Sequence, residues 1–287
     1  MLLVRIHLMK TILIPTDFSE NSWSALQYAI RFFKDVSCNF YILHVGHIRQ
    51  SSIKGNSFTF PTGELDLPIK EKLDGLFDKI KGLPHYTHHN FIALQEYGNL
   101  VNTIRKVVDK KKIDLIVMGT KGASGIKEAI VGSNTGDVIT KIQCDVLVVP
   151  ENTTTFSIKE ITFSTDYNIF YNNTILESLA EILNITQSHL NVLNVSRPNT
   201  HLSTLQEENK KFLFDYLSET FPNKVTFHTL SNTSSVSMAI QNSLAHNNVD
   251  MIIMVAKNLN FLQQLLFDTT IEKLSFHTTV PLLVLHE

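Results

Sequence analysis

The sequence predicts an α/β protein made of two tandem domains, each with a largely parallel sheet. Two observations carry this prediction. Strand-like runs alternate with helical patterns along the chain, and the second half of the chain repeats the first. The 287 residues are too many for one ordinary small domain and enough for two, and 43% hydrophobic residues can supply two cores.

The repeat is visible as three matching pairs of segments. The pairs are KTILIPTD (10–17) with KEITFSTD (159–166), DLIVMG (114–119) with DMIIMV (250–255), and VLVVP (146–150) with LLVLH (282–286). Each pair is separated by about half the chain, so the repeated unit is a whole domain rather than a short solenoid repeat. We expect domains at 1–150 and 158–287, joined by the linker ENTTTFS.

The first half contains the periodic patterns of a strand–helix alternation. Strands are expected at 11–15, 39–45, 88–95, 114–119 and 145–149. Helical spacing is shown by Ala25, Ala29, Phe32 and Phe33, by Leu100, Ile104, Val107 and Val108, and by segments 67–82 and 133–143. Residues 46–66 contain glycine and proline and are expected to form a long loop. Alternating strands and helices favour parallel pairing with right-handed crossovers.

The second half follows the same order of patterns. Strands are expected near 159–164, 189–195, 224–230, 250–255 and 281–286. Helices fill the gaps between them, for example with Val236, Ile240 and Leu244 on one face.

Composition excludes several functions. With 25 Lys and Arg against 27 Asp and Glu, the net charge of −2 gives no broad basic face for nucleic acid. Cys38 and Cys144 have no ligand or redox spacing and are expected to be buried, inert thiols. His85, His88 and His89 are expected to be surface histidines rather than metal ligands. No run approaches the ~18 apolar residues of a membrane span, so a cytoplasmic protein without membrane partners is expected.

One glycine-rich stretch has the features of an anion site. Gly119 and Gly122 follow the fourth strand, and after nine further residues Gly132 and Ser133 precede a helix. Glycines let a backbone approach a ligand, and a helix N-terminus offers unpaired N–H groups and a favourable dipole. The stretch lacks the Gly-Lys-Ser/Thr of a Walker A loop, and the first strand lacks a G-x-G-x-x-G fingerprint. It therefore predicts a phosphate site of another kind, unless the glycines form a loop without a ligand.

Together with the opening ILIPTDFS (12–19), this stretch resembles the ATP-binding signature of universal stress proteins. The resemblance covers both halves, but only the first half carries the full motif. It implies five-stranded parallel sheets in the order 3-2-1-4-5, flanked by helices, in two doubly wound domains. In that order the reversal lies between strands one and four, where open α/β sheets bind ligands. The segment Pro15-Thr16-Asp17 and the glycine stretch both end at this point.

The resemblance also implies roles for individual residues. The implied ligand is ATP, AMP or ADP, with Mg²⁺ bridging the phosphates. Pro15, Thr16 and Val45 would line the base pocket, Asp17 would contact the ribose or adenine edge, and Met118 and Gly119 would lie by the ribose. Gly122, Gly132, Ser133 and Asn134 would hold the phosphates. For Asp17 the alternative is a helix-capping role.

The second half departs from the motif. Val255 stands opposite Gly119, Asn258 opposite Gly122 and Asp268 opposite Gly132, although Asp166 still matches Asp17. Added side chains and a carboxylate at the helix N-terminus disfavour phosphate binding. One nucleotide per chain is therefore expected, in the first domain.

The expected function is a stress-associated, regulatory or protective nucleotide-binding protein without dedicated catalytic residues. Two alternatives stay open: a slow ATPase that uses the same site, and an interaction module whose site is vestigial. The resemblance further implies that the two domains pair through their last strands, VLVV and LLVL, and that two chains can associate as a homodimer.

Overall fold

The computed structural model describes most of the chain. The described residues are 9–46, 53–54, 57–58, 67–84, 86–120, 133–151, 153, 156–196, 200–231, 248–256 and 280–287. The expected helix with Val236, Ile240 and Leu244 lies outside them, as do His85, Gly122, Gly132, Asn258 and Asp268.

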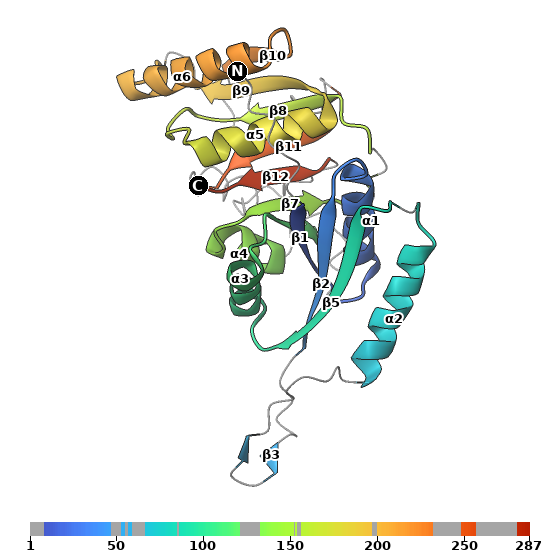
Figure 1. The fold of residues 1–287 in the computed structure, drawn as a ribbon. Helices are drawn as coiled ribbons and strands as arrows, with labels where there is room; N and C mark the ends of the chain where they lie inside the picture. Colours follow the sequence, from blue (N-terminus) through green and yellow to red (C-terminus); the bar gives the residue numbers. More distant parts are fainter. Residues whose placement is uncertain are drawn as a thin grey trace.

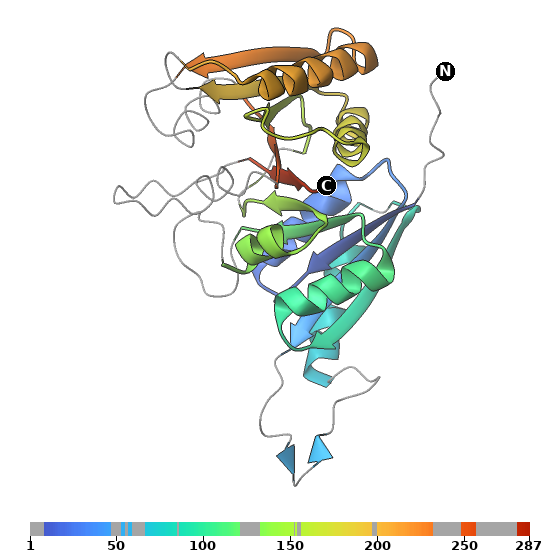
Figure 2. The same cartoon turned by 90° about the vertical axis from the view of Figure 1, so that its left-hand side faces the viewer.

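The first half alternates strands and helices as the sequence predicts. Its elements are β1 (Lys10–Pro15), α1 (Glu20–Phe32), β2 (Cys38–Gly46), β3 (Ile53–Lys54), β4 (Ser57–Phe58), α2 (Leu67–Lys81), β5 (His89–Tyr97), α3 (Leu100–Lys111), β6 (Leu115–Gly119), α4 (Ser133–Lys141) and β7 (Asp145–Val149). One expectation needs correction. Segment 46–66 is not loop throughout, because β3 and β4 pair antiparallel within it and lie apart from the main sheet (Figures 1 and 2).

The second half repeats the arrangement. Its elements are β8 (Glu160–Ser164), α5 (Asn173–Thr186), β9 (His189–Ser196), α6 (Thr204–Thr220), β10 (Val225–Ser231), β11 (Met251–Val255) and β12 (Leu282–Leu285). Local sequence signals fix the helix starts. Ser19, Asn99, Asn172 and Ser203 are N-caps whose side chains accept backbone N–H bonds, and Ser203 forms a capping box with Gln206.

All main strands belong to one ten-stranded sheet in the order β10-β9-β8-β11-β12-β7-β6-β1-β2-β5. Within each half the strands are parallel and follow the predicted order 3-2-1-4-5. At the centre β12 and β7 pair antiparallel, with Leu283 opposite Leu147 (Figure 1). The last strands of the two halves thus join two doubly wound sheets into one.

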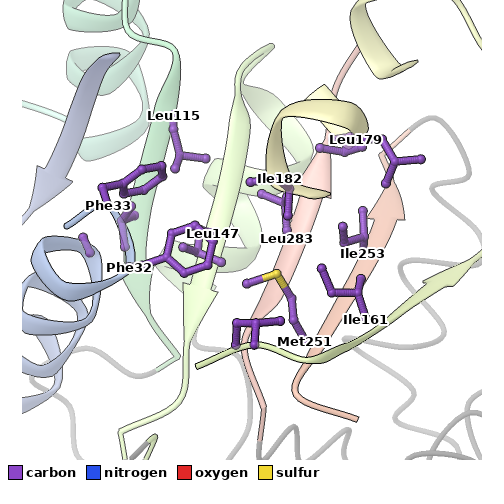
Figure 3. Packing of buried hydrophobic residues seen from close by; sticks show 14 of the residues in the cluster. Phe32, Phe33, Leu115, Leu147, Ile161, Leu179, Ile182, Met251, Ile253 and Leu283 are labelled. Atoms are coloured by element: carbon purple, nitrogen blue, oxygen red, sulfur yellow. The ribbon is translucent and has the colours of Figure 1, made fainter. Parts of the chain in front are cut away.

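The core forms a layer on each face of this sheet. One layer contains buried residues of α1, α2, α5 and α6, and the other contains residues of α3 and α4. Both layers contain residues from both halves. Figure 3 shows the first layer at the junction, where Phe32 of α1 and its C-cap Phe33 lie on one side of Leu147 and Leu283, and Leu179 and Ile182 of α5 lie on the other.

Polar contacts reinforce the junction. Asp145, at the start of β7, accepts the backbone N–H of His286 at 2.8 Å and the Ser178 hydroxyl of α5 at 2.8 Å. The Lys10 ammonium pairs with Glu181 of α5. Phe156, in the connecting segment, packs against Tyr28 and under the Arg31 guanidinium of α1. The connecting segment is therefore anchored on the first half at Phe156.

Candidate functional site

The candidate site begins where two neighbouring strands separate. Strand β1 pairs with β6 at Ile12 and Leu13, and the pairing ends there, although both strands continue. Strand β1 stays paired with β2 as far as Pro15, opposite Leu43. Since all three strands are parallel, the turn after Pro15 and the end of β6 at Gly119 lie at the same edge of the sheet. The structure thus brings together the two segments that the sequence predicts to converge.

A tight hydrogen-bonded turn holds Thr16 and Asp17. The Thr16 hydroxyl accepts the Phe18 N–H at 3.0 Å, and Asp17 Oδ1 accepts the Ser19 N–H at 3.0 Å and the Ser19 hydroxyl at 2.6 Å. Phe18 has φ of 65°, a left-handed conformation that is unusual for a non-glycine residue. The cap of α1 is Ser19 rather than Asp17, and the Asp17 side chain is exposed. Asp17 therefore organises the turn without capping the helix.

Strand β2 supports this turn from the side. Thr16 donates its N–H to Leu43 at 2.8 Å, and its carbonyl accepts the ring N–H of His44 at 2.9 Å. Val45, the next residue, is half-buried, and its side chain packs against the core layer of α3 and α4. The His44 contact was not anticipated, since it depends on how β1 and β2 lie together.

Gly119 is enclosed on two sides. A Cβ added at Gly119 would lie 2.4 Å from Asn21 Nδ2, because the buried Asn21 side chain of α1 occupies that space. The Gly119 carbonyl accepts the Thr135 hydroxyl of α4 at 2.9 Å. Glycine is thus needed here for packing against α1, in addition to any approach of a ligand. Asn21 and Thr135 were both missed from the sequence, where Thr135 adjoins the glycine stretch but Asn21 lies far from it, close to the Asp17 turn.

The remaining predicted residues fall into two groups. Ser133 and Asn134 are exposed in the first turn of α4, which the Thr135 bond ties to the end of β6. The Met118 side chain is buried in the core layer with α3 and α4, and Pro15 is half-buried. The described part of the chain thus brings the Asp17 turn, Gly119 and the α4 N-terminus to one edge of the sheet.

The second half preserves the turn in detail. Thr165 accepts the Tyr167 N–H at 3.1 Å, Asp166 accepts the Asn168 N–H at 2.9 Å, and Tyr167 has φ of 58°. Asn194 takes the place of His44 and donates to the Thr165 carbonyl at 3.0 Å. The turn is therefore a property of the repeated fold and is not by itself evidence of a ligand.

The second half differs in several side chains that contact that turn. The loop from Thr165 to its helix cap Asn172 is longer than the loop from Thr16 to Ser19, and it contributes Tyr171, a buried ring whose hydroxyl bonds the Thr165 hydroxyl at 2.7 Å. In the first half the Ser22 hydroxyl makes the corresponding contact, at 3.0 Å.

Helix α6 closes over the same turn in the second half. Gln206 and Asn209 donate side-chain amides to the carbonyls of Asp166 and Tyr167, at 2.8 and 2.9 Å. Val255 pairs with Leu285 as Gly119 pairs with Val149, so a buried valine stands at the glycine position. The second-half turn is thus bonded by side chains of α6, and Asp166 is half-buried where Asp17 is exposed.

Histidine and cysteine provide no metal or redox centre in the described part of the chain. No group of three or more His, Cys, Asp or Glu there is arranged to hold a metal ion. His88 is half-buried, and the expectation of a surface residue is wrong for His89, which is buried because its ring packs on Phe40 and bonds the Phe33 carbonyl at the end of α1. Cys38 and Cys144 are buried free thiols, and burial raises the pKa of each to about 12.

Comparison with known proteins decides the family. The profile of the Universal stress protein family matches residues 9–150. Universal stress protein MJ0531 of Methanocaldococcus jannaschii is 32% identical over 143 residues, which cover 50% of this chain and 83% of that protein. The chain belongs to the universal stress protein family. A second relative, Universal stress protein MJ0577 of the same organism, is 31% identical over 155 residues, covering 49% of this chain and 94% of the relative.

The whole chain is also similar to a solved universal stress protein. A crystal structure from Archaeoglobus fulgidus covers 96% of this chain and 96% of its own, with a TM-score of 0.66 and 20% identity. This similarity concerns the fold alone, and it extends over both halves of the chain. No helix among the described residues is long and apolar enough to cross a membrane.

Proposed function

We propose that this chain is a stress-associated protein that binds one adenine nucleotide, in its N-terminal half. The proposed domains are 1–150, which carries the site, and 158–287, which has lost it. One observation supports this most strongly: the same turn occurs in both halves, but Tyr171 and the α6 side chains bond to it in the second half, whereas Asp17 of the first-half turn is exposed.

The first half offers groups that fit the parts of a nucleotide. The exposed Asp17 carboxylate can accept bonds from ribose hydroxyls or an adenine amino group. Ser133 and Asn134 lie exposed at the N-terminus of α4, where N–H groups and the helix dipole favour phosphate. Gly122 and Gly132, outside the described residues, would supply further N–H groups. This division places base and ribose at β1 and the phosphates at α4.

Mg²⁺ is proposed to accompany ATP. It binds ATP through phosphate oxygens and water and needs few protein ligands. The lack of a clustered His, Cys, Asp or Glu site in the described part of the chain is compatible with that mode of binding.

The proposal is tested by matched substitutions in the two halves. Asp17→Ala and Asp166→Ala each remove the turn hydrogen bond from the N–H two residues on, at 3.0 and 2.9 Å, and Asp17→Ala also removes the bond from the Ser19 hydroxyl, so stability is measured for both variants beside binding. Isothermal titration with ATP and with AMP should show affinity reduced about tenfold or more in Asp17→Ala, the loss expected for a hydrogen bond to a charged group. Asp166→Ala should bind as the wild type does.

A second readout separates binding from a vestigial site. ATP at about 100 times its dissociation constant should raise the free energy of unfolding by about 2.7 kcal/mol. Failure of ATP, ADP and AMP to bind or to protect against heat would overturn the proposal and favour an interaction module. Steady release of phosphate from ATP by the wild type, lost in Ser133→Ala and Gly132→Asp, would instead show that the protein also hydrolyses ATP slowly at this site.

A further inference from the structure

Three large apolar side chains are exposed together at the outer end of the second half. Phe170, in the loop before α5, is 65% exposed, and Leu205 and Phe212 of α6 are 59% and 45% exposed. The Phe170 and Phe212 rings stack, with centroids 6.1 Å apart and an interplanar angle of 14°. Leu205 lies two turns before Phe212 on the same side of the helix. These residues are called the α6 patch; clustered exposure of this kind marks an interaction surface.

The α6 patch is held on a rigid support. Leu213 and Leu217 anchor α6 in the core, and Asn209, between Leu205 and Phe212, donates to the Tyr167 carbonyl at 2.9 Å. Figure 2 shows α6 lying along the outermost strands β9 and β10, away from the junction of the halves. The patch is thus displayed in a fixed geometry and lies far from β7 and β12.

Acidic side chains surround the patch. With 3.6 residues per turn, Glu208, Asp215 and Glu219 project from the same flank of α6 as Phe212. All three are exposed, and none forms an ion pair within the described part of the chain. Lys211 is the one exposed cation beside them on the described helix, so carboxylates prevail.

We propose that the α6 patch binds a cationic amphipathic segment of a partner protein. Apolar side chains of that segment would cover Phe170, Leu205 and Phe212, and its Lys or Arg residues would face the surrounding carboxylates. Charge complementarity favours this occupant over two others. A second copy docked through the same flank would bring Glu208 of each chain together, and anionic lipid or nucleic acid would be repelled.

The test uses the full-length chain and two synthetic helical peptides. One peptide carries Leu on one face and Lys on the other, and its control replaces every Lys with Glu. Fluorescence anisotropy should show binding of the Leu/Lys peptide and at least about tenfold weaker binding of the Leu/Glu peptide. Added salt should weaken the Leu/Lys complex, because exposed charges are screened.

Matched variants locate the binding surface. Phe170→Ser and Phe212→Ser should each weaken the Leu/Lys peptide by about tenfold, as expected for loss of an aromatic anchor. Phe214→Ser is the control: Phe214 is 49% exposed on the other flank of α6, where it packs on Phe227. It should bind as the wild type does. Phe170→Ser lies outside the helix, so it keeps the test valid if Phe212→Ser unfolds.

Several outcomes would overturn the proposal. These are equal binding of both peptides, equal binding by Phe170→Ser and Phe214→Ser, or sedimentation showing that the chain self-associates through Phe170. None of them bears on the nucleotide, because the α6 patch lies in the half proposed to lack that site.

Discussion

Gly119 and Asn21 form a close pair at the edge of the proposed nucleotide site. The asparagine side chain takes the volume that a Cβ at position 119 would need. In the second half Val255 stands at the equivalent position and fills it with its own side chain, so no glycine is needed there. The pair therefore distinguishes the two halves at a single contact.

Gly119→Ala should lower the free energy of unfolding by about 1–3 kcal/mol, the usual range for overpacking a buried site. Asn21→Ala in the same chain should remove most of that loss, because it vacates the space. Chemical denaturation of the wild type, both single variants and the double variant gives the coupling energy. Strictly additive effects would show that the steric contact has been misassigned.

The residue scale also shows how far sequence interpretation reaches. Thr16 and Asp17 lie in the turn at the expected edge of the sheet because they belong to a contiguous motif that ends a strand, and their contact with a nucleotide stays a prediction. Asn21, His44 and Thr135 were not recognised, because their contacts join residues far apart in the sequence. His89 was misjudged for the same reason: its burial comes from Phe40 and the end of α1, which the local pattern does not reveal.

Strand β12 is followed directly by His286, whose surroundings make its protonation costly. His286 Nε2 donates to the Ile139 carbonyl of α4 at 2.9 Å, which fixes the proton on that nitrogen. Burial lowers the pKa of His286 below its ordinary 6.5, although Asp145 nearby acts in the opposite sense. The folded protein therefore takes up a second proton on the His286 ring less readily than the unfolded chain does.

It follows that His286 contributes stability fully above pH 6.5 and loses it as pH falls through its folded pKa. Urea denaturation between pH 7 and 5 should show the wild type losing up to about 1.4 kcal/mol per pH unit relative to His286→Gln. Burial raises the pKa of Asp145, so that carboxyl acts with the opposite sign, but it is present in both proteins. A pH-independent difference between them would contradict this assignment.

At the scale of elements, periodicity located the main strands of both halves and the helices of the first half to within a few residues. The order 3-2-1-4-5 followed from the family resemblance and holds in both halves. Strands β3 and β4 were not predicted, because two-residue strands such as Ile53–Lys54 leave no period to detect. The contact of Tyr171 with the Thr165 turn was also not predicted, because a slightly longer loop before α5 does not disturb the sequence repeat.

On the scale of the whole molecule, the pairing of β7 with β12 joins the two sheets. Residues Val146, Leu147 and Val148 of β7 are buried, and β12 supplies the hydrogen-bond partners on that side. A fragment ending at residue 157 would leave β7 as an exposed apolar edge strand, which tends to pair with another copy.

The fragment 9–157 should therefore sediment as a dimer, with β7 of each copy antiparallel about a two-fold axis. Leu147→Lys in this fragment should shift it toward monomer, because it places a charge at the centre of the new contact. The full-length chain, in which β12 already covers β7, serves as the comparison. A folded fragment that stays monomeric at every concentration would show that the edge is protected in another way.

The antiparallel contact of β7 and β12 has one more consequence. In a pair of identical subunits every substitution appears twice, so a ligand site cannot be lost on one side and kept on the other. Here the partner is tethered, and dilution cannot separate the two halves. The two sides of the pseudo-symmetric pair are encoded independently, which lets one side diverge toward a different task while the interface that stabilises both is retained.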